Sequence, residues 1–189
     1  MGRKAVYTET ELLDATEKLL ITHGYDGFHL KLLSEHVNGA RSTIYQYYAN
    51  KEEVIVACVR RAMQRIIKKI EVIDETDAME ALRETLRAYV EESKLHRILS
   101  AASKVKVDEA SNIEADLQYV TDGHEWLKQQ LFRLMNRAQQ EGHLREDVPI
   151  MAILSVFFTF VDVPNTMGVS HDEWTTILFK IWLEGVKLT

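Results

Sequence analysis

The residues best suited to chemistry lie at positions 41–48, with the sequence Arg-Ser-Thr-Ile-Tyr-Gln-Tyr-Tyr. In a short helix Ile44 and Tyr48, four residues apart, would share the buried face. The outward face would carry a guanidinium, two hydroxyls, two phenols and an amide but no carboxylate, from Arg41, Ser42, Thr43, Tyr45, Gln46 and Tyr47. Hydroxyls and phenols donate to phosphate oxygens, and Arg and Gln reach base edges in a major groove. This face suits a polyanion; an ordinary polar surface is the alternative.

A preceding helix and a tight turn would position these groups. Leu30, Leu33 and Val37 recur at helical spacing and predict a short helix with one buried face. Asn38-Gly39 follows, and this pair accepts positive φ, which ends the helix and turns the chain. Lys51 begins another predicted helix, where the helix dipole favours a bound phosphate. The order of elements predicts a DNA-binding helix-turn-helix.

The segment from about Thr8 to Val59 resembles the N-terminal domain of TetR-type (tetracycline-repressor family) transcriptional regulators. In that family a helix ends in a His/Arg-Gly-Tyr/Phe pattern before the helix-turn-helix. The matching residues here are Leu12, Leu13, Ala15, Leu19, Gly24, Tyr25, Leu33, Thr43, Ile44, Tyr45, Tyr47, Tyr48, Asn50, Lys51, Glu52 and Val54. The resemblance implies a DNA-binding domain at 1–52 and a helical effector-binding and dimerisation domain at 53–189.

The resemblance also implies a function. We expect a homodimeric repressor that a small effector releases from a near-palindromic operator in double-stranded DNA, with dimerisation through the last two helices, at about 150–162 and 172–187. Arg41 and Gln46 are expected to contact bases, and Lys31 a base or a phosphate. The residues expected to hold phosphates are Ser42, Thr43, Tyr45, Tyr47 and Lys51.

Two short segments depart from the family pattern. Phe28-His29 stands where the family places Thr or Ser, whose hydroxyl caps the second helix. That cap is therefore either missing or supplied by His29. Val37-Asn38-Gly39-Ala40 replaces the usual Ala-Gly-Val-Ser turn. Asn38 can take the left-handed conformation of the usual glycine, whereas Gly39 is expected to sacrifice an apolar contact.

Composition places the chain among helical proteins. It has 189 residues with only two prolines, and no segment alternates with period two, which predicts an all-α fold. Residues 1–70 carry a net charge of +3 and residues 71–189 a net charge of −9, so a basic end can approach phosphate. The lone Cys58 excludes an intramolecular disulfide and is expected to be a buried packing residue. With no signal-peptide core and no span of about 20 apolar residues, we expect a cytoplasmic protein that does not enter the membrane.

The remaining elements are predicted from caps and periodicity. Thr8 and Glu11 form a capping box for a first helix that stops near Gly24, behind a short basic arm containing Arg3 and Lys4. Residues 108–119 are ambiguous, either extending the preceding helix or forming a mobile connection. Later helices are predicted at about 51–73, 78–95, 97–107, 123–142, 150–161 and 174–186.

Three functions remain open for the helical remainder. Apolar side chains could line an effector cavity, each with plain core packing as the alternative: Met63, Ile66, Leu86, Tyr89, Ile98, Leu99, Trp126, Phe157 and Phe160. A helical metal-dependent enzyme could instead use Glu92 and His96, four residues apart, with His124-Glu125 and His143 completing the site. In the third, a protein partner controls a DNA-binding protein that has no cavity. No cofactor is expected.

Overall fold

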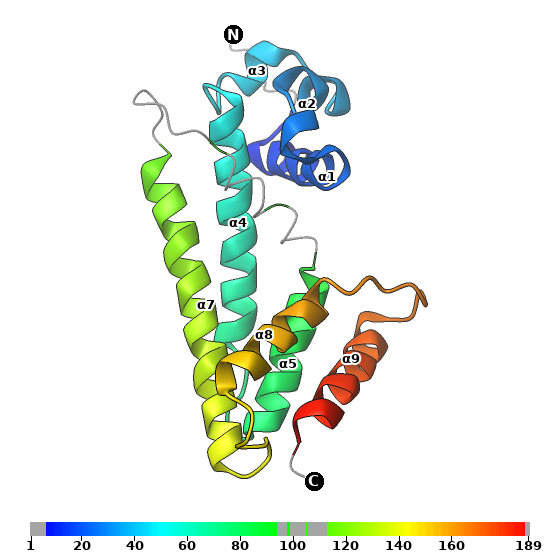
Figure 1. The fold of residues 1–189 in the computed structure, drawn as a ribbon. Helices are drawn as coiled ribbons and strands as arrows, with labels where there is room; N and C mark the ends of the chain where they lie inside the picture. Colours follow the sequence, from blue (N-terminus) through cyan, green and yellow to red (C-terminus); the bar gives the residue numbers. More distant parts are fainter. Residues whose placement is uncertain (1–6, 94–97, 99–104, 106–112, 188–189) are drawn as a thin grey trace. The chain divides into compact units, whose positions relative to one another are not determined.

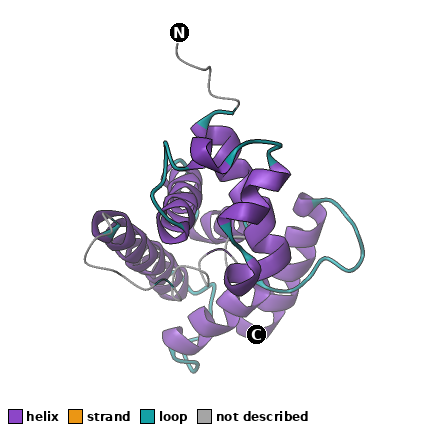
Figure 2. Cartoon of the chain, turned by 90° about the horizontal axis from the view of Figure 1, so that it is seen from above, coloured by secondary structure: helices purple, strands orange, loops and turns teal. Residues whose placement is uncertain are grey.

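The computed structural model describes residues 7–93, 98, 105 and 113–187, and this part of the chain is built from helices and loops (Figures 1 and 2). Its only β-type pairing within those ranges is an isolated bridge between Leu144 and Lys187. The all-α prediction is therefore confirmed. The described helices are α1 (Glu9–Gly27), α2 (Leu30–His36), α3 (Arg41–Ile44), α4 (Lys51–Glu71), α5 (Ala78–Glu91), α7 (Glu114–Gln140), α8 (Ile150–Val161) and α9 (His171–Val186).

The chain divides into two compact units. The first comprises residues 1–64 and 94–122, and the second comprises residues 65–93 and 123–189. We call the described residues 7–64 the head and the second unit the body. The functional division at residues 52 and 53 stays a prediction. None of the helices in the described ranges is long and apolar enough to cross a membrane.

The first helix begins where its sequence predicts, but its predicted stop near Gly24 is a kink, and the helix continues to Gly27. The Thr8 side chain accepts from the Glu11 backbone N–H at 3.2 Å, and the Glu11 carboxylate accepts from the Thr8 backbone N–H at 2.6 Å, so the capping box is present. Gly24 interrupts α1 with a φ of 65°, a conformation that glycine adopts without a steric penalty. The basic arm lies outside the described residues.

Apolar residues from α1, α2, α3 and α4 form the core of the head. Ile44 is completely buried and Tyr48 nearly so, as their spacing predicts. The Tyr48 hydroxyl donates to Glu9 Oε1 at 2.8 Å. Cys58 is buried, as predicted. The largest contributors to this core are Leu12, Leu20, Phe28, Leu33, Ile44 and Ile55.

The body is formed by α5, α8 and α9, which contact one another, together with the end of α4 and most of α7 (Figure 1). The predicted start of α7 at Gly123 is wrong, because the helix begins at Glu114. Val120 and Leu127 are both buried and seven residues apart, so one apolar stripe continues through Gly123, and packing outweighs the cost of about 1 kcal/mol for glycine. The predicted helix at 97–107 lies almost entirely outside the described residues.

The last two helices agree closely with prediction. The helix α8 has its predicted bounds, and α9 begins at His171 instead of Trp174 because the Ser170 side chain accepts from the Glu173 backbone N–H. α8 buries Ile153, Leu154, Phe157 and Val161. The Phe157 and Trp182 rings meet edge to face with centroids 5.2 Å apart, which fixes α8 against α9.

Candidate nucleic-acid interface

The helix α2 is capped by an imidazole. Residue His29 occupies the N-cap position in extended conformation, and its Nδ1 accepts from the Leu32 backbone N–H at 2.9 Å. Of the two alternatives left by the sequence, the cap supplied by His29 is the correct one. The acceptor nitrogen must be unprotonated for this bond, so the imidazole does here what a Ser or Thr hydroxyl does elsewhere.

Replacing His29 by alanine is expected to lower the free energy of unfolding by about 1 kcal/mol, because one N–H of the first turn of α2 loses its partner. His29→Ser is the matched control and should keep most of the stability, since its hydroxyl can accept the same bond. Denaturant unfolding near neutral pH measures both variants. An alanine variant as stable as the unmodified chain would contradict a stabilising cap.

The turn between α2 and α3 relies on its asparagine. Asn38 has a φ of 51°, and among the described residues it is the one non-glycine residue with a positive φ. Its predicted left-handed conformation is therefore confirmed. The Gly39 backbone N–H donates to the Ser34 carbonyl at 3.0 Å and helps to close the turn. The expected loss of an apolar contact at Gly39 is wrong: a Cβ there would lie 2.0 Å from Tyr7 Cε1, so the Tyr7 ring already fills the space.

The helix α3 is shorter than predicted. It ends at Ile44, and the chain continues in hydrogen-bonded turns, with the backbone N–H groups of Tyr47 and Tyr48 both donating to the Ile44 carbonyl. The predicted outward direction of Thr43 is wrong, because this residue is only 9% exposed. Its side chain lies beside the Tyr7 hydroxyl. Position 43 therefore belongs to the inner side of the helix.

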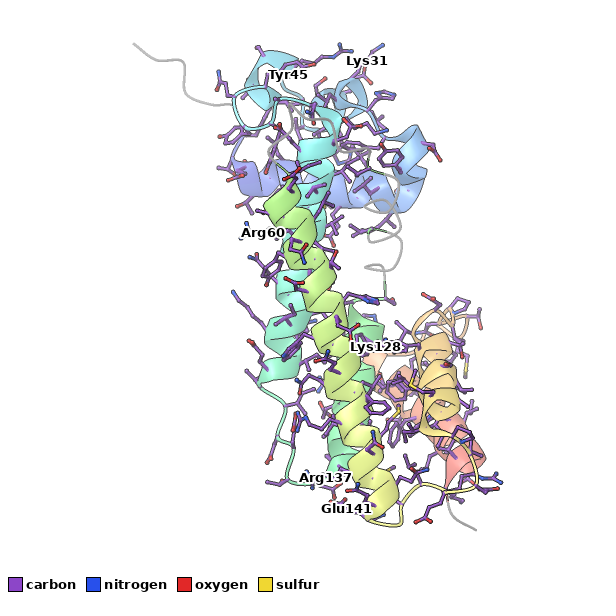
Figure 3. The ribbon with its side chains drawn as sticks, turned by 60° about the vertical axis from the view of Figure 1, so that its left-hand side comes forward. Lys31, Tyr45, Arg60, Lys128, Arg137 and Glu141 are labelled. Carbon is purple, nitrogen blue, oxygen red and sulfur yellow. The ribbon has the colours of Figure 1, made fainter. Side chains whose placement is uncertain are left out.

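The other predicted outward residues of this segment are exposed. Tyr45 is 54% exposed, and Figure 3 places it with Lys31 at the same end of the head, both pointing outward. The Lys31 ammonium lies 3.8 Å from Glu35, and both side chains face solvent, so this weak pair leaves the cation available. The exposed set comprises Lys31, Arg41, Ser42, Tyr45, Gln46 and Tyr47.

Lys51 is tied to the end of α1. Its ammonium donates to the Tyr25 carbonyl at 2.7 Å and lies 4.0 Å from the centroid of the Tyr25 ring. The Tyr25 hydroxyl in turn donates to Glu52 at 3.3 Å. An ammonium has three donors, so Lys51 can join α1 to α4 and still offer an N–H to a phosphate. The predicted phosphate contact of Lys51 stays a prediction.

Sequence reasoning missed one residue of this region, Tyr7. It precedes the capping box and is 5% exposed, and its hydroxyl donates to the Ala40 carbonyl at 2.9 Å. Burial raises the pKa of the Tyr7 hydroxyl, and hydrogen bonds from Thr43 and the Ile44 backbone partly oppose that rise. Two features of the sequence could have indicated this contact: the aromatic Tyr7 stands next to a helix cap, and Gly39 stands where an aliphatic residue is usual.

The predicted effector-lining residues are distributed over both units. Ile66, Leu86, Tyr89 and Phe157 are buried in the body, where Trp126 and Phe160 are partly exposed. Met63 and Ile98 are buried in the first unit, and Leu99 lies outside the described residues. Burial raises the pKa of the Tyr89 hydroxyl, as an apolar environment should.

The body also contains an open hollow of about 310 Å³. None of the predicted lining residues belongs to it. It is lined by Asp77, Met79, Glu80, His143, Phe179, Leu183 and Lys187. Asp77 already caps α5, and Glu80 pairs with Arg83, so its carboxylates have partners within the protein. The predicted cavity lining therefore stays a prediction.

Glu92, the described ligand of the metal-enzyme alternative, is paired with two cations of α4. The Glu92 carboxylate lies 3.2 Å from Arg65 and 2.9 Å from the Lys69 ammonium. Burial would raise the pKa of Glu92, but hydrogen bonds and charge from Lys69 and Arg65 lower it on balance. His96 lies outside the described residues, and within them no three His, Cys, Asp or Glu side chains gather as metal ligands. Glu92 joins α4 to α5.

The outer faces of α8 and α9 carry exposed apolar side chains. Met151 and Val156 on α8 are 49% and 46% exposed, and Ile181 on α9 is 58% exposed. Exposed apolar side chains that form one continuous patch are typical of a surface that another protein chain covers. The prediction that this surface pairs with a second copy rests on the family resemblance.

Comparison with protein families and curated proteins identifies relatives of this chain. Residues 12–58 match the family model "Bacterial regulatory proteins, tetR family". The HTH-type transcriptional repressor AcnR of Corynebacterium efficiens is 24% identical over 161 residues, which cover 85% of this chain and 81% of the repressor.

Solved structures share the fold over nearly the whole chain. The ketosteroid transcriptional regulator KstR2 of Mycobacterium tuberculosis is 17% identical, with a TM-score of 0.77 over 99% of this chain and 100% of that one. AibR, solved in complex with isovaleryl coenzyme A and operator DNA, is 14% identical, with a TM-score of 0.73 over 92% and 96%.

Proposed function

Because the chain belongs to the TetR family of bacterial regulatory proteins, we propose that it is a sequence-specific DNA-binding transcriptional repressor that a small effector releases from its operator. The observation that carries this proposal is the exposed face beside α3. Residues 41–47 carry hydroxyl, phenol, amide and guanidinium groups without a carboxylate. A face of this kind accepts phosphates and base edges and does not repel them.

The proposed operator is a near-palindrome. In a homodimer that pairs through α8 and α9, two copies of α3 would enter successive major grooves about 34 Å apart. Arg41 and Gln46 would contact base edges, with Lys31 at a base or a phosphate. Exposed Ser42, Tyr45 and Tyr47, together with Lys51, would hold the DNA backbone. Because Thr43 is buried, we assign it no DNA contact.

The proposed trigger is a small molecule bound by the body. Its apolar, partly aromatic interior is the kind of environment in which helical proteins bind such ligands. AibR, which shares the fold, was solved with an acyl-coenzyme A and operator DNA, and this supports control by a ligand. An effector that binds best when the heads are apart would shift the population away from the DNA-bound form. We expect this regulator to act in the cytoplasm and not as an enzyme.

Selection of genomic fragments by the purified protein tests the proposal and supplies the operator. Gln46→Ala should then weaken operator binding by about 1–3 kcal/mol and leave binding to random DNA almost unchanged, because a base contact is lost. Lys51→Ala should weaken both kinds of binding alike and reduce the salt slope by about 1, because a phosphate contact is lost.

Thermal unfolding of both variants controls for structural damage, which matters for Lys51 because it also joins α1 to α4. Equal losses on operator and random DNA for Gln46→Ala would defeat the assignment of that residue to base contact. A protein that enriches no genomic fragment would defeat the proposed function itself.

A further inference from the structure

The Tyr7 side chain packs against the turn that connects α2 to α3. It comes from the residue just before the cap of α1, 33 positions away from the carbonyl that its hydroxyl contacts. The ring is almost entirely buried, and the Tyr7 carbonyl accepts from the Tyr47 hydroxyl at 3.3 Å. Residue 7 is thereby bonded on both sides of α3, to Ala40 before the helix and to Tyr47 after it.

The ring occupies the space beside Gly39. A Cβ built on Gly39 would lie 2.0 Å from Tyr7 Cε1, 2.8 Å from Cδ1 and 3.1 Å from Cζ, and the first two distances are far inside van der Waals contact. Gly39 is not among the glycines with positive φ, whereas its neighbour Asn38 has a φ of 51°. The sign of φ therefore does not require a glycine at position 39. The glycine is needed because the Tyr7 ring is there.

The hydroxyl of Tyr7 is bonded at the start of α3, where the N-cap side chain makes no hydrogen bond. Ala40 is the N-cap residue of α3, and it has no side-chain oxygen that could accept from the first turn. The Tyr7 hydroxyl lies at this helix start, where it donates to the Ala40 carbonyl and lies beside the buried Thr43 side chain. A phenol from outside the turn thus holds the first turn of a helix that is only four residues long.

We propose that Tyr7 is a positioning residue for operator recognition, which acts by seating its ring in the notch at Gly39 and holding the start of α3. The exposed Arg41 and Ser42 follow Ala40 directly, so any shift of this turn moves the groups that meet the DNA. This inference rests on the proposed DNA-binding function. Tyr7 and Gly39 therefore form a matched pair, because the large ring at position 7 fits only when position 39 has no side chain.

A double-mutant cycle tests the pair. Gly39→Ala should reduce operator affinity by about tenfold, the scale of one lost base contact, with little change in affinity for random DNA. Tyr7→Ala should also weaken operator binding, because the ring beside Gly39 and the hydrogen bond to the Ala40 carbonyl are both lost. Adding Gly39→Ala to Tyr7→Ala should then have almost no further effect. Tyr7→Phe, which keeps the ring, should leave the penalty of Gly39→Ala in place.

Asn38→Gly is the control in the same turn, since glycine accepts its positive φ, and this variant should bind operator like the unmodified protein. The proposal is overturned if Gly39→Ala is harmless, or if it is equally harmful with alanine at position 7. It is also overturned if the effects of the two substitutions on the unfolding temperature depend on each other, while their effects on the ratio of operator to random-DNA affinity are independent. Coupling in unfolding by a protein that selects no DNA at all would instead mark failure of the proposed function.

Discussion

Replacing Ile181 by lysine is expected to separate the protein into monomers and to weaken operator binding by about 10²–10⁴-fold. Ile181 is 58% exposed on α9 although it is strongly apolar. A charge buried in the proposed dimer interface has a large desolvation cost. A monomer then binds a single half-site and loses the effective concentration that linkage gives to the second. Analytical ultracentrifugation and operator titration measure the two effects.

Ile181→Met is the matched control, because methionine keeps the apolar character and approximate volume of the side chain. It should remain dimeric and bind operator normally. A lysine variant that stays dimeric would place the interface elsewhere. One that becomes monomeric yet binds operator with unchanged affinity would show that recognition does not require two linked heads.

Truncating Phe157 to alanine is expected to lower the free energy of unfolding of the body by about 3–5 kcal/mol. The side chain is completely buried, and its ring meets Trp182 edge to face at 5.2 Å, so the change leaves a cavity and removes an aromatic contact. All three tryptophans of the chain belong to the body. Denaturant unfolding followed by tryptophan fluorescence therefore reports on this unit.

Phe132→Ala makes the same chemical change on α7, where the ring is 38% exposed. Because that ring is already partly in water, the variant should lose far less stability, about 1 kcal/mol or less. Similar losses at both positions would contradict the assignment of Phe157 to the core. Both variants are compared at one protein concentration, since dimerisation adds to apparent stability.

Features specified by neighbouring residues were predictable from the sequence. The capping box at Thr8 and Glu11 and the positive φ of Asn38 each depend on residue types within one turn of the chain. The bounds of α8 were equally clear, because proline precedes a continuous apolar run. Local steric and hydrogen-bonding rules decide these features, and no distant residue overrides them.

Features that depend on distant residues were missed. The burial of Thr43 and the glycine at position 39 follow from Tyr7, which lies more than thirty positions away. Periodicity placed Thr43 outside because spacing within the segment carries no information about a distant side chain, here Tyr7, that lies beside it. The start of α7 was displaced because glycine normally favours an end, and only packing shows that Gly123 is tolerated. For the effector cavity, apolar spacing identifies buried residues but not the empty space among them.

The bonds that cross the head have a consequence for its motion. Tyr7 with Ala40, Tyr48 with Glu9 and Lys51 with Tyr25 join partners 26 to 39 positions apart, and each includes α1 or the residues before it. Such sequence separations raise the contact order of a small helical domain and slow its folding. They also tie α1 to the residues on either side of α3 and to the start of α4, so the slow amide protons of these elements should exchange together as one foldon.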